Sequence, residues 1–172
     1  MPRVFLGIGS NHRAEEHLSA ALDCLLLQFH DLALSPVFES EAKGGGAPYL
    51  NLVAAIETEL KPGELRDWIK ALETKLGRRR PSLPEGAVSI DIDLLTYGKL
   101  SGKVDGIQLP RPELIEAAYV LWPLAVLAPK EKHPQLQRSY AELWQDFAPG
   151  DQAIRPVDFI WHERRISSAA LS

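Results

Sequence analysis

Residues 88–97 alternate between apolar and polar side chains, and this alternation constrains the fold more than any other feature of the sequence. Successive side chains of a β-strand point to opposite faces of a sheet, so a period of two predicts a strand with one buried face. We expect Ile90, Ile92 and Leu94 on the buried face and Asp91 and Asp93 on the other. Such a strand needs neighbouring strands and a second layer that covers its apolar side.

The segments before this strand change their hydrophobic period in a definite order. Short apolar runs predict three strands, and apolar residues spaced three and four apart predict two helices. The predicted strands are 4–8, 32–39 and 49–56, and the predicted helices end at about residues 30 and 77. The second strand contains Pro36, which cannot donate to a central ladder, so an edge position is expected.

The resulting order, strand-helix-strand-strand-helix-strand, predicts an α+β fold of the ferredoxin-like type. In this βαββαβ arrangement an antiparallel sheet carries two helices on one face, so the opposite face is expected to be open to ligands. After residue 98 we expect a C-terminal extension with helical segments at 112–118, 120–127 and 139–147. A length of 172 residues predicts a single domain over 1–172.

Charge and composition narrow the classes of partner. A formal net charge of −4 argues against a nucleic acid held by general electrostatics. No stretch approaches the roughly 20 apolar residues that cross a bilayer, so we expect no membrane partner and a cytoplasmic location. The single cysteine, Cys24, is expected in the core of a helix. The sequence does not predict an oligomeric state.

The paired aspartates are the sharpest chemical signal. Side chains two residues apart on a strand lie about 6.6 Å apart along its axis, so the carboxylates of Asp91 and Asp93 converge and repel each other. A divalent cation would remove this repulsion, and Mg²⁺ favours a few carboxylates together with substrate phosphates. The alternative is a solvated sheet face on which two acids fall at period two. Arg78, Arg79 and Arg80 precede the pair and could neutralise phosphate oxygens, or form an ordinary solvated loop.

Tyr49 and Asn51 are expected on the same face as the two aspartates. An aromatic ring can stack on a flat heterocycle, and an amide offers both a donor and an acceptor to its edge. The alternative is that they are packing and turn residues near the start of a strand.

Together these motifs resemble the 6-hydroxymethyl-7,8-dihydropterin pyrophosphokinases of folate biosynthesis. The resemblance spans about residues 4–128 and depends on several motifs in the same order. They are Gly7-Ile8-Gly9-Ser10-Asn11, Pro48-Tyr49-Leu50-Asn51, Glu73 with Gly77-Arg78, Asp91-Ile92-Asp93-Leu94, and Leu121-Trp122-Pro123-Leu124 with Ala128-Pro129.

The resemblance implies transfer of pyrophosphate from ATP to the pterin hydroxymethyl group, with release of AMP. It implies two Mg²⁺ ions held by the paired aspartates. Asn51 and Ser40 would bind the pterin, and its ring would lie between Tyr49 and Tyr119, the latter at a position where the family usually has phenylalanine. The resemblance also assigns catalytic roles to Arg78 and Arg80 and ATP binding to Arg80; in place of the family's histidine near the nucleotide, Arg111 is expected to contact ATP.

Three positions on the ATP side differ from the family pattern. Val88 replaces an arginine, Arg111 replaces the histidine, and Ala117 replaces another arginine. Each lost electrostatic donor would cost about 2 to 4 kcal/mol of transition-state stabilisation unless Arg111 or Arg79 compensates. Two alternatives therefore stay open beside the pyrophosphokinase: a divergent pterin enzyme with another substrate or phosphate donor, and a non-catalytic pterin-binding protein.

Overall fold

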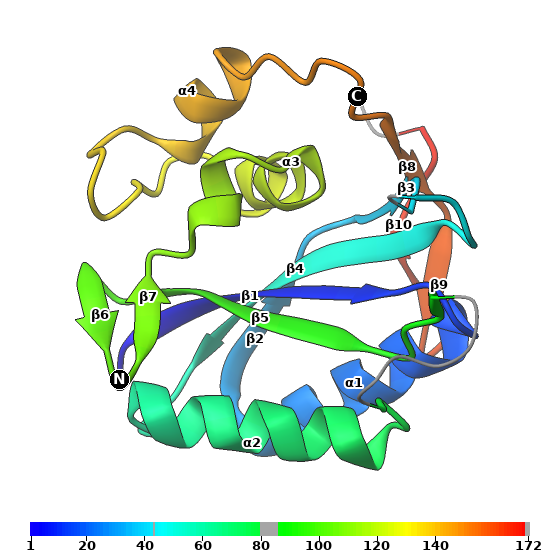
Figure 1. The fold of residues 1–172 in the computed structure, drawn as a ribbon, viewed down its shortest axis with the longest axis horizontal. Coiled ribbons are helices and arrows are strands. Elements are labelled where there is room, and N and C mark those ends of the chain that lie inside the picture. Colours follow the sequence, from blue (N-terminus) through cyan, green and yellow to red (C-terminus); the bar gives the residue numbers. More distant parts are fainter. Residues whose placement is uncertain (43, 80–85, 171–172) are drawn as a thin grey trace.

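The computed structural model describes residues 1–42, 44–79 and 86–170. Within them, β1 (Arg3–Ser10), β4 (Tyr49–Glu57) and β5 (Asp91–Tyr97) are the middle and one edge of an antiparallel sheet. The strands β3 (Val37–Ser40) and β8 (Ile154–Val157) extend it, in the order β5-β1-β4-β3-β8. The helices α1 (Ala14–Gln28) and α2 (Pro62–Lys75) lie together on one side of this sheet (Figure 1). The strand order and this helical layer confirm the predicted ferredoxin-like arrangement.

The alternation within β4 and β5 is also confirmed. Ile92 and Leu94 of β5 are buried in the core cluster beneath α1 and α2, together with Leu52 of β4. Their neighbours Asp91 and Asp93 point to the opposite face. Burial of apolar surface stabilises the fold by about 25 cal/mol per Å². The buried face of β5 therefore fixes the opposite face as the one that the two acids occupy.

The second face of the sheet is not open along its whole length, contrary to the expectation. The helix α3 (Ala118–Leu127) covers one half of it and packs against a second apolar cluster. The strand residues in that cluster are Phe5, Val53, Ala55 and Leu95. In the described structure the other half of the face, where the same strands carry glycines and polar residues, is left for a ligand.

The predicted strand at 32–39 is two strands, which corrects the expected single edge strand. The chain runs as β2 (His30–Leu34), breaks at Ser35 and Pro36, and resumes as β3 (Val37–Ser40). At the break, Ser35 Oγ accepts from the backbone N–H of Val53 at 2.8 Å. Because β8 pairs with the far side of β3, β3 is an inner strand.

The C-terminal extension is partly β-structure, whereas only helices were expected there. A hairpin of β6 (Gly102–Val104) and β7 (Ile107–Leu109) precedes a 3₁₀ helix (Pro112–Ile115). After α3 and α4 (Tyr140–Gln145), the chain forms β8 (Ile154–Val157), β9 (Phe159–Trp161) and β10 (Arg164–Ser167). These last strands are short and mixed in polarity, so their sequences carry a weak strand signal.

Two smaller expectations have separate outcomes. Cys24 is a free thiol on α1, partly buried against the core cluster, which agrees with a packing role. Among the described helices, none combines the length and apolar character required to cross a bilayer.

A matched pair of leucines on α1 tests the assignment of its buried face. Leu22 is fully buried, whereas Leu27 is 89% exposed. Leu22→Ala is expected to lower the free energy of unfolding by about 2 to 5 kcal/mol, because it leaves a cavity in the core. Leu27→Ala should change it by less than about 0.5 kcal/mol. Urea denaturation measures both, and equal losses would contradict the assignment.

Candidate active site

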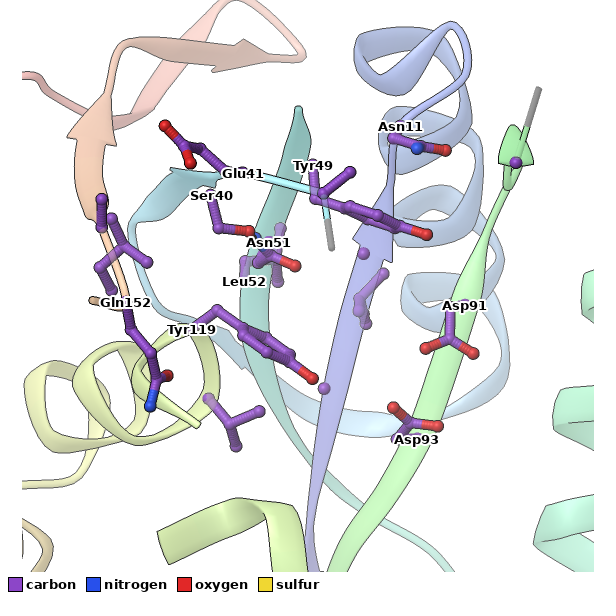
Figure 2. Close-up of a pocket in the computed structure, with 18 of the residues that line it drawn as sticks. Asn11, Ser40, Glu41, Tyr49, Asn51, Leu52, Asp91, Asp93, Tyr119 and Gln152 are labelled. Atoms are coloured by element: carbon purple, nitrogen blue, oxygen red, sulfur yellow. Dashed lines mark hydrogen bonds between the residues drawn. The ribbon is translucent and has the colours of Figure 1, made fainter. Parts of the chain in front are cut away.

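The open half of the sheet face forms the floor of a cavity of about 680 Å³, called here the main cavity. Figure 2 shows Asp91 and Asp93 on β5, with Tyr49, Asn51 and Tyr119 on the other walls. The remaining described lining residues are Gly7, Ile8, Gly9, Asn11, Ser40, Glu41, Ala42, Gly45, Leu52, Gly86, Val120, Asp151, Gln152, Ala153 and Ile154. The structure therefore brings six of the predicted site residues together, including Ser40.

Strand register explains why these side chains meet. In β1, Gly9 is paired with Asn51 on one side and with Asp91 on the other. A Cβ atom at Gly9 would lie 2.9 Å from Asn51 Oδ1, closer than packing allows. A glycine at this position therefore lets the amide and the carboxylates face the same volume across a strand without a side chain.

Asn51 is buried and its orientation is fixed by the neighbouring strand. Its Nδ2 donates to Ser40 Oγ at 2.8 Å and approaches the carbonyl oxygen of Phe38 at 3.5 Å. The Ser40 hydroxyl accepts this bond and keeps its own proton to donate to a ligand. Together the two residues present a polar edge to the cavity.

The two tyrosines extend the cavity above this polar edge. Burial raises the pKa of Tyr119 above its usual value, and the carboxylates of Asp93, Glu113 and Asp91 raise it further, against an opposing effect of Arg111. Burial and Asp91 raise the pKa of Tyr49 in the same way, against an opposing effect of Arg78. Both phenols are therefore neutral at physiological pH, and their rings offer uncharged stacking surfaces.

The aspartate pair is electrostatically unfavourable as it stands. Burial and the neighbouring Asp91 carboxylate raise the pKa of Asp93 from 3.8 to about 7, although Arg111 lowers it. Arg111 Nη2 lies 3.5 Å from Asp93 Oδ1, and Arg78 Nη1 lies 3.2 Å from Asp91 Oδ1. One arginine thus stands beside each carboxylate.

Arg78 was expected to act as a loop cation that closes over phosphates. Its side chain is instead held in place by contacts within the protein. Its side chain is 16% exposed, and its Nη1 donates to the carbonyl oxygen of Ile90 at 2.8 Å. The same nitrogen lies 3.6 Å from the buried Glu73 carboxylate. Arg80, predicted to bind ATP, lies outside the described residues. Arg79 is exposed on the loop.

A second cavity of about 400 Å³, called here the side cavity, lies against the other side of β5. It shares Asp91 and Asp93 with the main cavity. Three cationic residues line it, namely Arg66, Lys70 and Arg111. Glu73 and Glu113 line it as well, and Arg111 Nε lies 3.1 Å from Glu113 Oε2. The two aspartates therefore stand between a cavity with aromatic and amide walls and one whose walls carry both cationic and acidic side chains.

Some residues at the site carried no predicted role. Asn11 Oδ1 accepts from the backbone N–H of Val88 at 2.6 Å, and Asn11 Nδ2 donates to Ala47 O at 3.2 Å, so Asn11 ties together two segments beside the cavity. The helix α1 begins after Arg13 without a side-chain cap, so Asn11 has this bridging role and does not cap the helix. Long-range bonds of this kind have no local sequence signal.

Glu73 belongs to one of the family motifs without an expected role of its own, and its buried carboxylate anchors the aspartate strand. The backbone N–H of Ile92 donates to Glu73 Oε2 at 2.9 Å. This bond satisfies a donor of an edge strand that would otherwise lack a ladder partner. A glutamate at a buried helical position was the available signal.

Of the three positions that depart from the family pattern, two are occupied by apolar residues. Val88 uses its backbone N–H in the bond to Asn11, and Ala117 is buried in the apolar cluster beside α3. Only the third, Arg111, brings a cation to the aspartates.

The donor set fits Mg²⁺ better than a metal with an all-protein cage. In the described part of the chain, no group of three or more His, Cys, Asp and Glu side chains has metal-binding geometry. Two carboxylates in a cavity with room for phosphates and waters are the set that Mg²⁺ uses. Burial and the Asp91 carboxylate raise the pKa of Asp93, and a cation at this place would counter both effects.

Comparison with known proteins gives consistent matches. The model of the 7,8-dihydro-6-hydroxymethylpterin-pyrophosphokinase (HPPK) family matches residues 5–129. The 2-amino-4-hydroxy-6-hydroxymethyldihydropteridine pyrophosphokinase of Pseudomonas aeruginosa is 34% identical over 137 residues, which cover 77% of this chain and 84% of that protein. The protein of the same name from Aquifex aeolicus is 31% identical over 161 residues, covering 91% and 96%.

Solved structures show the same fold. Plasmodium falciparum HPPK-DHPS aligns with 96% of this chain at a TM-score of 0.73 and 11% sequence identity. This chain spans 50% of that longer protein.

The raised pKa of Asp93 predicts a specific pH dependence of stability in the ligand-free protein. An acid whose folded pKa lies above its unfolded value destabilises the fold as pH rises from about 4 to about 7. Asp93→Asn should therefore gain stability relative to the wild type over this range, reaching about 1 to 3 kcal/mol at pH 8. Urea denaturation without divalent cations measures the difference. Asp67→Asn, at an exposed position, is the matched control, and an equal trend in both variants would contradict the explanation.

Proposed function

The chain belongs to the 7,8-dihydro-6-hydroxymethylpterin-pyrophosphokinase family, and we propose that its two cavities hold the two substrates on either side of Asp91 and Asp93. The chain transfers pyrophosphate from ATP to the hydroxymethyl group of 6-hydroxymethyl-7,8-dihydropterin, a step of folate synthesis that releases AMP. The position of the aspartates between two chemically different cavities is the observation that carries the assignment of the substrates.

The main cavity is suited to the pterin. A flat heterocycle would stack between the rings of Tyr49 and Tyr119, both neutral at physiological pH. The amide of Asn51 and the hydroxyl of Ser40 would bond to the donors and acceptors along its edge. The hydroxymethyl group then points toward the aspartates.

The side cavity is suited to the triphosphate of ATP. Arg66, Lys70 and Arg111 line it, and their charges would neutralise phosphate oxygens. Arg111 lies nearest to the reacting groups, because it contacts Asp93. We therefore assign to Arg111, rather than to exposed Arg79, the positive charge that replaces the altered arginine and histidine positions.

Asp91 and Asp93 would hold Mg²⁺, in the two-ion arrangement that the family implies. Bound there, the metal supplies charge stabilisation to the transferring phosphoryl oxygens. The protein's own contribution is positioning: Arg78 holds Asp91, Glu73 holds the backbone of β5 beside it, and Arg111 holds Asp93. Because β8 joins the same sheet, we also propose that residues 1–172 act as one domain.

The distinguishing assay follows AMP against ADP with the hydroxymethyl-dihydropterin, ATP and Mg²⁺. We expect AMP and the pterin diphosphate from the wild type. Asp91→Ala should lower kcat at least about 100-fold, because it removes electrostatic stabilisation of the transition state. Asp146→Ala changes an exposed aspartate of the C-terminal region and is the control. Formation of ADP would indicate another reaction, and tight pterin binding without nucleotide turnover would contradict catalysis.

The role given to Arg111 predicts that its loss affects ATP and leaves the affinity for the pterin nearly unchanged. Arg111→Ala should raise KM for ATP about 10-fold and lower kcat, because a charge-assisted contact to phosphate is lost. The Kd for the pterin should change less than about 2-fold, since Arg111 does not line the main cavity. Steady-state kinetics and equilibrium titration measure these quantities, with exposed Arg138→Ala as the control. Unchanged ATP kinetics would contradict the assignment.

A further inference from the structure

One wall of the main cavity comes from residues 151–154, beyond the part of the chain that the family model matches. Strand register brings this wall to the site. Ile154, the first residue of β8, pairs with Ser40, the last residue of β3. Residues 151–153 therefore continue past the end of β3, where Ser40 faces the cavity (Figure 2).

The C-terminal arm, defined here as residues 148–170, is fastened to the sheet at several points. Ser167 is buried, and its Oγ accepts from the backbone N–H of Val37 at 2.7 Å and lies 2.6 Å from the carbonyl oxygen of Val157. Arg155 Nη2 lies 2.8 Å from Glu39 Oε1. These contacts give the arm a fixed position relative to β3.

The helix α3 begins without a cap of its own. Ala117 stands at the N-cap position and has no side-chain acceptor, so the first N–H groups of the helix need other partners. Gln152 supplies one from the arm. Its Oε1 accepts from the backbone N–H of Ala118 at 2.8 Å, and its Nε2 donates to the carbonyl oxygen of Glu116 at 3.0 Å.

This bridge, from the carbonyl oxygen of Glu116 through the Gln152 side chain to the N–H of Ala118, lies at the start of α3, directly before Tyr119. Ala118 is the first residue of α3 and Tyr119 is the second, so the bond to Ala118 fixes the backbone next to the aromatic side chain. The backbone of Gln152 is itself held, because its N–H donates to the carbonyl oxygen of Pro149 at 2.9 Å. Both ends of the bridge are therefore attached to ordered structure.

We propose that Gln152 is a positioning residue for pterin binding: it holds the start of α3 so that the ring of Tyr119 closes the main cavity. This inference rests on the proposed function of that cavity. Gln152 and the rest of the arm do not line the side cavity, so the effect is confined to the pterin. The C-terminal arm thus contributes to the binding of the pterin.

Two measurements on Gln152→Ala test the proposal. In the ligand-free protein, hydrogen exchange of the Ala118 amide should become at least about 5-fold faster, because its acceptor is removed. The Kd for the pterin should rise about 5- to 20-fold, whereas the Kd for ATP should change less than 2-fold. Gln152→Glu keeps an acceptor at the helix N-terminus and should recover most of the pterin affinity.

Gln135→Ala is the matched control, since the side chain of Gln135 donates to Ser101 outside both cavities. Unchanged exchange at Ala118, unchanged pterin affinity, or equal losses for pterin and ATP would each overturn the proposal. The exchange measurement needs neither substrate nor turnover. An inactive wild type would therefore contradict the proposed function, while the exchange rate would still decide whether Gln152 holds α3.

Discussion

Mutual repulsion between Asp91 and Asp93 is the constraint around which the site is arranged. Burial of Asp93 and the neighbouring Asp91 carboxylate both favour the protonated form of Asp93, which is why its pKa is raised to about 7. The protein offsets this cost on both sides, with Arg78 beside Asp91 and Arg111 beside Asp93. A divalent cation bound between the carboxylates, as proposed above, would relieve the same repulsion.

The strand that carries the pair is an edge strand and needs separate support. Its outer side has no neighbouring strand in the described structure, and Glu73 of α2 bonds to the backbone at Ile92 instead. Arg78 bonds to the carbonyl oxygen of Ile90 just before it. The absence of a neighbouring strand among the described residues leaves room beside β5 for the side cavity, so the aspartates line two cavities at once.

On the second face of the sheet, each central strand is divided into a polar part and an apolar part. On β1, Gly9 and Gly7 line the main cavity, whereas Phe5 belongs to the apolar cluster beneath α3. On β4, Asn51 lines the cavity and Val53 belongs to that cluster. The apolar parts bind α3, and the polar parts form the cavity floor. The position of α3 thus determines the size of the site, which gives the bridge from Gln152 its importance.

The sequence by itself determined the sheet, its helical layer and the aspartate face, because hydrophobic periods of two and of 3.6 residues are local properties that burial enforces. It also predicted Tyr49 and Asn51 at this face from the strand period, and Tyr119 through the family resemblance. Only the tertiary structure decided that α3 covers half of the second face, that Arg78 is anchored, and that Gln152 reaches the site. Each of these depends on contacts between residues far apart in the chain, for which no local pattern exists. For the same reason, the short strands β8 to β10, which are mixed in polarity, become strands only through pairing with the sheet or with each other.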